Sequence, residues 1–500
     1  MMPAARLEQG IRLAELLDGL VDTGNDTRVI SGLCLDSRKV KPGDLFCARK
    51  GSRVNAADYI AQAVGSGAVA VLLEDATPPG DLPRVGVPVF SCRDFARILG
   101  EVASRFFGRP SEQVPVVGIT GTNGKTSIAW LLTHAMTDNV HAAAMIGTLG
   151  IGFARNITES VNTTPDAITV HGSMSRLIDQ GADRVIMEVS SHALEQQRIA
   201  GVRFNQTLFT NLSREHLDYH SSMHTYALAK QRLFREYMAD YRILNIDDAF
   251  GRELWRSLGN DQSVYAYTLQ ESMGSDTRIL SARIVDNNLN GITLAIHSPW
   301  GEGEIHTHLL GEFNAYNVLA CTASLCLAGY PLDAIEQRLA QCPAVPGRME
   351  RFGREDTPLV IVDYAHSPDA LENVLRTLKP HTRGKLFCVF GCGGERDTGK
   401  RAEMGRVVDQ HADVIVVTND NPRGEDPEAI LRAILEGIDQ CRHVTVEPDR
   451  SAAITLAIRQ AGPEDTVLVA GKGHETSQLI QGEYLPFSDR NLVRTCLEAW

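Results

Sequence analysis

The chain of 500 residues carries 62 Asp and Glu against 49 Lys and Arg, a formal net charge of −13, and 43% of its residues are hydrophobic. This length and composition indicate a soluble globular protein of about two to four domains, and an acidic balance without a basic stretch disfavours a nucleic-acid-binding protein. Ten cysteines without a C-x-x-C pair indicate free thiols in a reducing compartment. The N-terminus has no apolar signal-peptide core and no apolar run approaches membrane-spanning length, so we expect a cytoplasmic protein without membrane or nucleic-acid partners.

Residues 1–92 predict a small α/β domain, with a helix near 56–66 followed by an apolar strand at 68–73. Two polar turns could bind a phosphorylated ligand, one containing Ser37 and the other formed by Gly51-Ser52-Arg53. An exposed polar loop is the simpler interpretation of both turns, and the sequence alone favours it.

A phosphate-binding loop is predicted at residues 121–126, Gly-Thr-Asn-Gly-Lys-Thr. It follows an apolar strand at 114–119 and precedes apolar residues at helical spacing, so its glycine N–H groups and the helix N-terminus can converge on an anion. Lys125 supplies a charge for the β- and γ-phosphates, and the Thr126 hydroxyl can reach Mg²⁺. Gly118 lies six rather than five positions before the second glycine of the loop. The position of Gly-Lys-Thr at the helix start nevertheless favours a nucleoside triphosphate site over an ordinary glycine turn.

Two further polar positions indicate a metal beside that triphosphate. The apolar strand at 184–189 contains Glu188 near its end, where such folds hold Mg²⁺; a helix N-cap or a solvent-facing strand end is the alternative. His216 and His220 have a spacing that zinc sites use, but no third strong ligand follows at a suitable interval. We therefore interpret His216 as a residue near the triphosphate and Mg²⁺, with an ordinary loop histidine as the alternative. The loop at 162–166 is rich in hydrogen-bonding side chains.

Lys230 occupies an unexpected position for a charged residue. In the helix predicted at 225–237 it shares the apolar stripe with Tyr226, Leu233 and Tyr237. A lysine there either extends its amine to solvent or is buried with a lowered pKa. An uncharged amine can react with CO₂ to form a metal-binding carbamate, but the sequence alone favours the solvent-reaching side chain.

The boundary between the central and C-terminal domains is predicted at a Pro/Gly-rich hinge, residues 342–350, which carries Arg348. The central domain then covers residues 93–345 and the C-terminal domain residues 346–500. Within the central domain, Asn314 lies near the start of a predicted helix, where it could contact the nucleotide or cap the helix.

The C-terminal domain alternates strands and helices regularly, which predicts a parallel sheet with strands at 359–362, 386–390, 414–417, 443–446 and 466–469. Four of these strands end in polar loops, at 363–368, 391–397, 419–423 and 471–475. Open α/β sheets bind ligands at the carboxyl ends of their strands, so the four loops should converge. Arg396 and Arg423 suit carboxylates, whereas Asp420 and Glu475 suit an ammonium group. The pattern predicts a pocket for an amino acid with more than one carboxylate, rather than four ordinary glycine turns.

These motifs closely resemble those of the Mur ligase family across essentially the whole chain, at residues 121–126, 188–192, 216–218, 226–230, 311–314, 420–423 and 471–475. The resemblance implies an α/β fold of three domains, with a central P-loop-type ATPase domain and a C-terminal Rossmann-like domain. It also implies an ADP-forming, ATP-dependent acid–amino-acid ligase of peptidoglycan synthesis. The loops at 420–423 and 471–475 look like those of members that add meso-diaminopimelate to UDP-N-acetylmuramoyl-L-alanyl-D-glutamate. Lysine-adding relatives lack the arginine of Asp-Asn-Pro-Arg, in accord with lysine having no distal carboxylate.

The resemblance also implies roles for individual residues. Lys230 would be a carbamylated lysine, formed with CO₂, whose carboxylate holds a second Mg²⁺, and this implication replaces the solvent-reaching interpretation. The implied catalytic residues are Lys125, Lys230 and His216, and the implied metal ligands are Thr126, Glu188, His216 and Lys230. ATP would contact Gly121, Thr122, Asn123, Gly124, Lys125, Thr126, Ser127, Asn314 and Arg348. The UDP-muramoyl-dipeptide would contact Leu35, Ser37, Ser52, Arg53, Val54, Asn162, Thr163, Thr164, Ser190, Gln196 and Arg198. Diaminopimelate would contact Arg396, Asp420, Asn421, Pro422, Arg423, Gly471 and Glu475.

The implied reaction proceeds through an acyl phosphate, which must be protected from water by closure of the domains at the hinge near Arg348. The expected partners are these small-molecule substrates, and the expected state is a monomer. A lysine-adding ligase and a folylpolyglutamate synthetase are the alternatives that share the phosphate loop; the 420–423 loop disfavours the first and the N-terminal domain the second. A nucleotide-dependent switch or binding protein is the alternative from another class, and the charged C-terminal crevice disfavours it.

Overall fold

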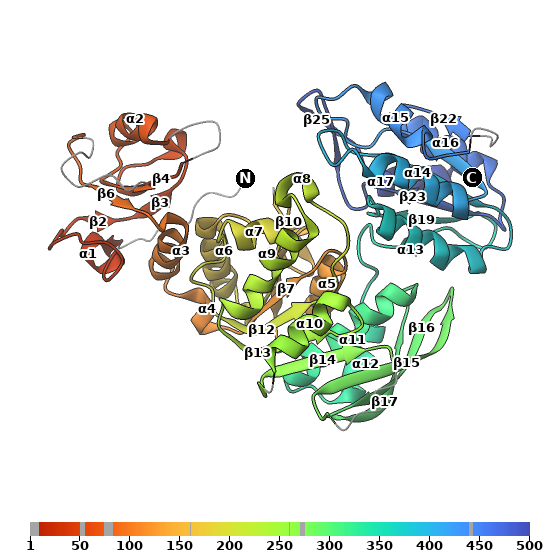
Figure 1. The fold of residues 1–500 in the computed structure, drawn as a ribbon, viewed down its shortest axis with the longest axis horizontal. Coiled ribbons are helices and arrows are strands. Elements are labelled where there is room, and N and C mark those ends of the chain that lie inside the picture. Colours follow the sequence, from red (N-terminus) through yellow and green to blue (C-terminus); the bar gives the residue numbers. More distant parts are fainter. Residues whose placement is uncertain are drawn as a thin grey trace. The chain divides into compact units, whose positions relative to one another are not determined.

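The computed structural model describes residues 10–50, 56–74, 84–160, 162–259, 261–270, 276–439 and 444–500. Its contacts divide the chain into two compact units. The first contains residues 1–120, 136–207 and 229–242, and the second contains residues 121–135, 208–228 and 243–500. Both units combine helices with sheets of largely parallel strands, which confirms the predicted α/β class (Figure 1). Within these described residues, no helix is both long and apolar enough to span a bilayer.

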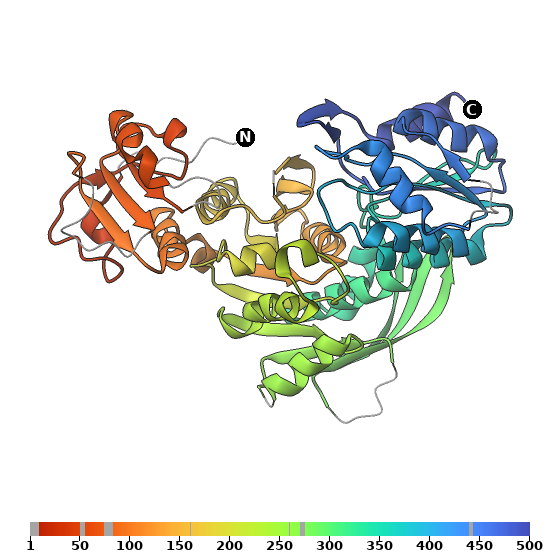
Figure 2. The ribbon, with the colours of Figure 1, turned by 45° about the horizontal axis from the view of Figure 1, so that its top comes forward.

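A four-stranded parallel sheet forms the N-terminal part of the first unit (red to orange in Figure 2). Its order is β3 (Gly32–Cys34), β4 (Asp44–Ala48), β5 (Ala70–Glu74) and β6 (Val89–Cys92). Successive side chains of a strand point to opposite faces. Leu45 and Cys47 therefore pack with α1 (Leu13–Leu16) and α3 (Phe95–Phe106), while Phe46 packs with α2 (Ile60–Gly65). The predicted strand and helix of this region are confirmed, the helix beginning with a 3₁₀ turn at Ala56–Tyr59.

The strand that precedes the phosphate loop belongs to a sheet of 11 strands. Its first seven strands are, in order, β10 (Asn156–Thr158), β9 (Gly150–Phe153), β8 (Ala143–Gly147), β11 (Arg184–Glu188), β7 (Val116–Thr120), β12 (Phe204–Phe209) and β13 (Ala239–Asn245). Strands β8, β11 and β7 are parallel, and every residue of β7 is buried. Gly118 lies inside β7, where an added Cβ would come 2.6 Å from the Phe204 ring. Gly118 therefore serves close packing within the sheet, which explains why it does not match the phosphate-loop spacing.

The second unit contains an antiparallel extension that the sequence did not predict. Strands β14 (Val264–Thr268) and β15 (Ile279–Asn288) are parallel, whereas β15, β16 (Gly291–Ser298) and β17 (Gly301–Thr307) form an antiparallel ribbon (Figures 1 and 2). Three helices pack against these strands: α10 (Ala249–Leu258), α11 (Glu312–Leu327) and α12 (Leu332–Ala340).

The C-terminal sheet of the second unit has the predicted parallel architecture. Its order is β18 (Glu350–Phe352), β19 (Leu359–Asp363), β23 (Thr466–Ala470), β20 (Leu386–Phe390), β21 (Val414–Val417) and β22 (Val444–Val446). All neighbouring strands are parallel except β18, which pairs antiparallel with β19. The strand predicted at 443–446 begins at Val444, and His443 lies outside the described residues.

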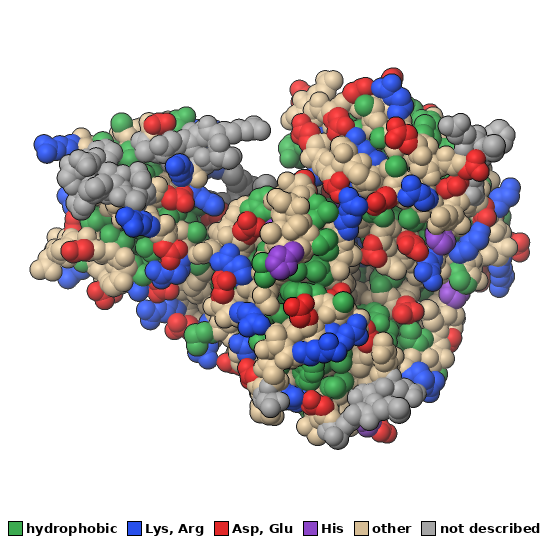
Figure 3. Space-filling model, viewed as in Figure 1, with side chains coloured by type: hydrophobic (Ala, Val, Ile, Leu, Met, Phe, Trp, Pro, Cys, Tyr) green, Lys and Arg blue, Asp and Glu red, His purple; other side chains and the backbone are tan. Residues whose placement is uncertain are grey.

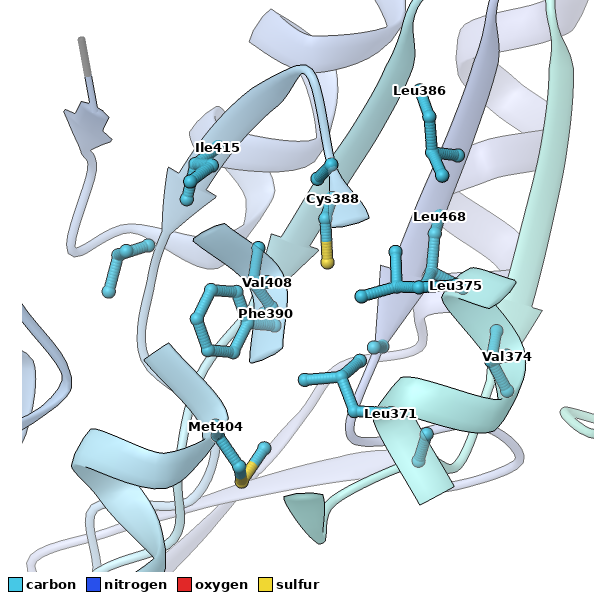
Figure 4. Close-up of a cluster of buried hydrophobic side chains, with 14 of the residues drawn as sticks. Leu371, Val374, Leu375, Leu386, Cys388, Phe390, Met404, Val408, Ile415 and Leu468 are labelled. Atoms are coloured by element: carbon cyan, nitrogen blue, oxygen red, sulfur yellow. The ribbon is translucent and has the colours of Figure 1, made fainter. Parts of the chain in front are cut away.

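Helices cover both faces of this sheet. Helices α13 (Pro368–Leu378), α14 (Lys400–His411) and α15 (Pro427–Leu435) lie on one face, and α16 (Arg450–Gln460) and α17 (Asp489–Glu498) on the other. Along β20, Leu386, Cys388 and Phe390 point to the first face, where Leu375 and Val408 meet them (Figure 4). Burial of both faces explains why these strands are continuous apolar runs, and it directs the polar residues to the strand ends.

A buried histidine in the first unit generates a pH prediction. On helix α6 (Ala167–Asp179), His171 is fully buried, its Nε2 lies 2.9 Å from the Ala200 carbonyl oxygen, and its Nδ1 has no hydrogen-bond partner in the described chain. Burial lowers the pKa of His171 from 6.5 to about 4, and the Ala200 carbonyl offsets only part of this effect.

Between pH 6.5 and about 4 the unfolded chain therefore binds a proton that the folded chain does not. We expect the free energy of unfolding to be unaffected by this group above pH 6.5 and to fall by about 3 kcal/mol as the pH approaches 4. Urea unfolding measures the free energy of unfolding at pH 7 and pH 5. The difference between the two values should be smaller for His171→Gln than for wild type, because the Gln amide can still donate to Ala200 but does not titrate. The exposed His297→Gln is the control, and an unchanged pH difference in His171→Gln would contradict the prediction.

Candidate functional site

The predicted phosphate loop, in the second unit, is held by hydrogen bonds to backbone and side-chain atoms of Thr210 and Asn211, which follow β12. Thr122 N donates to Asn211 O (2.8 Å), Asn123 N to Asn211 Oδ1 (2.9 Å), and Thr210 Oγ1 to Asn123 O (2.6 Å). An added Cβ on Gly121 would lie 1.8 Å from Thr210 Oγ1, so only glycine permits this approach. Sequence reasoning missed Asn211, whose role depends on a contact between segments distant in the chain.

Lys125 is the first residue of helix α5 (Lys125–Ala135), as expected for a phosphate loop. Its Nζ donates to the carbonyl oxygens of Gly121 and Thr122, at 2.8 Å each, so its amine lies over the loop rather than in bulk solvent. Thr126 and Ser127 follow in the first turn, and both are buried. The loop thus places a cation, a hydroxyl and a helix N-terminus together, the combination that a triphosphate requires.

Asn314 and Arg348 lie against the same loop in the second unit. Asn314 is buried and donates to Leu310 O (2.8 Å), while Asn317, which sequence reasoning missed, donates to Asn314 Oδ1 (2.8 Å). An added Cβ on Gly124 would come 2.4 Å from Asn317 Oδ1, which shows how closely this pair approaches the loop. Gly311, not Asn314, is the N-cap of α11, so the capping alternative is wrong.

The Arg348 guanidinium lies 4.4 Å from the centroid of the Tyr364 ring and donates from Nη2 to Thr126 Oγ1 (3.3 Å). The hinge arginine is therefore directed at the phosphate loop by an aromatic face. Tyr364 also packs against the ring of His474, with 5.1 Å between centroids, so the ring contacts both the hinge arginine and the loop after β23.

Glu188 is enclosed at the end of β11 in the first unit. Its side chain is fully buried, Oε1 accepts from Thr148 N (2.8 Å), and Oε2 accepts from Thr148 Oγ1 (3.0 Å). The solvent-facing alternative is wrong, and the N-cap of the following helix, α7 (Ser191–Glu195), is Ser190. Thr148 was not predicted, because nothing near it in sequence marks it as a partner of Glu188.

Several residues predicted to bind the UDP substrate gather around Glu188. Thr164 Oγ1 donates to Glu188 O (2.8 Å), and Arg198 Nη1 donates to Thr164 O (2.8 Å). Gln196 Oε1 accepts from Arg198, and the hydroxyls of Thr148 and Thr163 are 3.1 Å apart. Asn162 is exposed beside them, and Ser190 bonds to Thr164 through its backbone N–H (3.0 Å).

The other residues predicted for that substrate lie elsewhere. Leu35 and Ser37 belong to the N-terminal sheet region, where Ser37 Oγ donates to Gln62 Oε1 (3.0 Å). Ser52, Arg53 and Val54 lie outside the described residues.

Lys230 lies on helix α9 (Met223–Arg235) and is 1% exposed. The interpretation in which its amine reaches solvent is therefore wrong, because a side chain that reaches water retains an exposed head group. Helical periodicity correctly placed Lys230 on the apolar stripe, but only the packing around α9 determines that the whole side chain is enclosed.

His216 has a left-handed backbone conformation (φ +55°) at the start of α8 (Leu217–His220), and its ring packs edge-on against Tyr226 with centroids 6.1 Å apart. Beside it, Glu215 accepts a hydrogen bond from His366 (3.1 Å). Burial raises the pKa of the Glu215 carboxyl, but the His366 hydrogen bond and the charges of His216, His366 and Lys125 outweigh burial and hold this pKa well below its usual value. Sequence reasoning missed Glu215.

Within the described ranges, no cluster of three or more His, Cys, Asp and Glu side chains could hold a metal ion. A metal site would need other oxygen donors, such as a threonine hydroxyl, a lysine carbamate or phosphate oxygens.

The loops after β20, β21 and β23 come together as predicted. Asp420 is 8% exposed, and its Oδ2 has no hydrogen-bond partner in the described chain. An added Cβ on Gly471 would come 2.5 Å from that oxygen, and one on Gly394 would come 2.0 Å from Pro422 O, so glycine is required at both positions. Arg423 has φ +56° and donates from Nη1 to Gly394 O (2.9 Å).

The remaining members of the predicted pocket also lie at this edge. Asn421 donates to Glu475 Oε2 (2.9 Å), while Arg396 is half exposed with its Nη1 3.9 Å from Asp218 Oδ2. On the face seen in Figure 3, Lys and Arg side chains are interspersed with Asp and Glu, so the cations of the loops are local features rather than part of a broad basic surface.

Three family descriptions match successive parts of the chain: "Mur ligase family, catalytic domain" at residues 29–107, "Mur ligase middle domain" at 119–325, and "Mur ligase, glutamate ligase domain" at 347–473. Together with the site, these matches define an ATP-dependent ligase. The chain belongs to the Mur ligase family.

A relative from Alkalilimnicola ehrlichii, the UDP-N-acetylmuramoyl-L-alanyl-D-glutamate--2,6-diaminopimelate ligase, is 45% identical over 97% of this chain and 98% of its own. A solved structure with the same ligase title is 34% identical, covers 98% of this chain and 99% of its own, and has a TM-score of 0.70. MurF from Acinetobacter baumannii covers both chains completely with a TM-score of 0.67, and at 17% identity it shows a shared fold alone. The predicted family and fold of three domains are confirmed.

The Arg348–Tyr364 contact generates a prediction for nucleotide binding. Tyr364→Leu removes the aromatic face that holds the guanidinium near Thr126, so we expect the KM for ATP to rise about 5-fold. Tyr364→Phe keeps the face and should remain within about 2-fold of wild type. Steady-state kinetics over a range of ATP concentrations measures both, and equal KM values for the two variants would contradict the role of the ring.

Proposed function

We propose that this chain adds meso-diaminopimelate to UDP-N-acetylmuramoyl-L-alanyl-D-glutamate, with cleavage of ATP to ADP and phosphate, as a cytoplasmic step of peptidoglycan synthesis. The loop pocket after β20, β21 and β23 carries the proposal, because it combines Arg423 with the carboxylates of Asp420 and Glu475. A diaminoacid with two carboxylates needs both kinds of group. The names of relatives at 45% and 34% identity over nearly full length support this choice.

Arg423 is suited to the distal carboxylate that lysine lacks. Its Nη1 is held by the carbonyl oxygens of Gly394 (2.9 Å) and Asn421 (3.3 Å), and within the described chain its Nε and Nη2 make no hydrogen bond. Those two nitrogens form the fork that pairs with a carboxylate in a bidentate manner. This geometry favours diaminopimelate over the alternative substrate, L-lysine.

The reaction we infer has two steps. The side-chain carboxylate of D-glutamate attacks the γ-phosphorus of ATP, giving an acyl phosphate and ADP, while Lys125 and Arg348 stabilise charge on the phosphate oxygens. A neutral amine of diaminopimelate then attacks the acyl carbon, and phosphate leaves from the tetrahedral intermediate with loss of the amine proton. Asp420 and Glu475 orient the amino acid, and exclusion of water prevents hydrolysis of the acyl phosphate.

Thr126, Glu188, His216 and a carbamate on Lys230 would hold Mg²⁺. The fit rests on donor chemistry: Glu188 is a fully buried carboxylate, Thr126 is a buried hydroxyl, and a carbamate on the buried Lys230 would add a second carboxylate-like donor. When bound, Mg²⁺ neutralises charge on the transferring phosphate. We further propose division into domains at residues 1–92, 93–345 and 346–500, and a monomeric state.

Phosphate release from ATP with UDP-N-acetylmuramoyl-L-Ala-D-Glu, offering meso-diaminopimelate and L-lysine in parallel, tests this function. We expect turnover with diaminopimelate alone and a loss of about 100-fold in kcat/KM in Arg423→Ala, because a bidentate charged contact is removed. Arg432 is an exposed arginine of helix α15, which packs on the same sheet. Arg432→Ala is therefore the matched control and should retain wild-type kinetics.

Turnover with lysine would retain the family but overturn the specificity. Phosphate release indifferent to either amine would favour the nucleotide-dependent switch, the alternative from another class.

Carbamylation of Lys230 has its own spectroscopic test. In protein equilibrated with ¹³C-bicarbonate, we expect a ¹³C carbamate resonance that is absent from Lys230→Met, because Lys230 is the amine that we propose to be carbamylated. Lys379→Met removes an exposed lysine and should retain the resonance. Active wild-type enzyme without this signal would refute the carbamate.

A further inference from the structure

Lys472 is a buried cation to which the reaction above gives no role. It lies in the loop after β23, between Gly471 and Gly473, and its side chain is 0% exposed. A buried ammonium is costly unless charged or polar groups surround it closely. Its partners therefore indicate what its enclosure accomplishes.

Both side-chain partners of Lys472 belong to the predicted amino-acid pocket. Its Nζ donates to Glu475 Oε2 (2.6 Å) and to Asn421 Oδ1 (3.0 Å), and Asn421 Nδ2 donates to the same Glu475 oxygen (2.9 Å). The three side chains thus form a closed triangle of hydrogen bonds. The triangle joins the loops after β21 and β23, two strands that are not neighbours because β20 lies between them.

The triangle also determines which way the Asn421 amide faces. Asn421 Oδ1 accepts from both Lys472 Nζ and Leu479 N (3.0 Å each), so a flipped amide would direct its NH₂ group at two donors. The carbonyl oxygen and one amide hydrogen of Asn421 are therefore committed within the protein. This side chain supports the pocket, and one amide hydrogen remains for a ligand.

Glu475, by contrast, keeps one oxygen for the ligand. Both of its bonds go to Oε2, Oε1 has no hydrogen bond in the described chain, and the side chain is 29% exposed. Asp420 Oδ2 in the neighbouring loop also lacks a partner there. Lys472 neutralises the Glu475 carboxylate, so Glu475 and Asp420 can lie in neighbouring loops without strong mutual repulsion.

We propose that Lys472 is a positioning residue for the amino-acid substrate, acting through Asn421 and Glu475 to hold the Glu475 carboxylate where it receives the substrate's ammonium group. This inference rests on the proposed function. Lys472 does not contact the substrate, and its removal should weaken amino-acid binding while leaving the phosphate loop intact.

Kinetics of Lys472→Met, Glu475→Gln and the double variant test this role. In Lys472→Met we expect the KM for meso-diaminopimelate to rise about 100-fold, because breaking a buried charge pair leaves Glu475 without its counter-charge, with the KM for ATP changed less than about 3-fold. The double variant should be no more than about 3-fold worse than Glu475→Gln alone, because a residue that acts through Glu475 has little left to affect. Lys379→Met, an exposed lysine of the same sheet domain, is the matched control.

The outcomes separate the inference from the proposed function. The positioning role would be overturned if Lys472→Met had the wild-type KM for diaminopimelate, or if the rise in KM in the double variant equalled the product of the two single rises. Turnover of the wild-type enzyme with diaminopimelate would still support the proposed function in either case. Wild-type enzyme without any diaminopimelate-dependent turnover would overturn the proposed function itself. Where Lys472→Met fails to give a cooperative thermal transition, Lys472→Gln, which keeps a donor for Asn421, replaces it. Failure of both variants to fold would assign Lys472 to stability and also overturn the inference.

Discussion

The ion pair between Arg450 and Asp489 is the constraint on which the arrangement of the loops after β21 and β23 depends. Both side chains are fully buried, and the guanidinium donates to both carboxylate oxygens (2.8 and 2.7 Å). It also donates to Ala470 O (2.9 Å) and Asn419 O (3.4 Å), at the ends of β23 and β21. No ladder of backbone hydrogen bonds sets the distance between these strands, since β20 separates them. A charged bridge with well-defined geometry does so, and a buried pair of this kind contributes specificity of arrangement more than net stability.

The phosphate loop is organised by a different force, close packing of backbone. Gly121 and Gly124 lie so near Thr210 and Asn317 that a Cβ would overlap both neighbours. The contacts with Asn211 orient the loop without any charged partner. This is suitable for an anion site, because the N-terminus of α5, with its partial positive charge, lies beside the loop.

These two arrangements meet at the hinge within the second unit. An added Cβ on Gly347 would lie 2.1 Å from His474 N, so the hinge packs directly on the loop after β23. The next residue, Arg348, lies over Tyr364 and bonds to Thr126 of the phosphate loop. The ring of Tyr364 therefore contacts Arg348 of the hinge and His474 of the loop after β23.

The sequence by itself determined the features that depend on local order: the phosphate loop, the parallel C-terminal sheet, its polar strand-end loops and the position of Lys230 on an apolar stripe. Strand and helix periodicity, glycine turns and helix starts are properties of neighbouring residues, so they can be predicted from the sequence. Only the tertiary structure decided that Lys230 is enclosed, that Thr148 holds Glu188, and that Asn211, Arg450 and Lys472 support the loops. The antiparallel ribbon β15–β17 was also visible only in the tertiary structure. Each of these depends on contacts between residues far apart in sequence, whose partners are chosen by packing and by the need to pair buried charges.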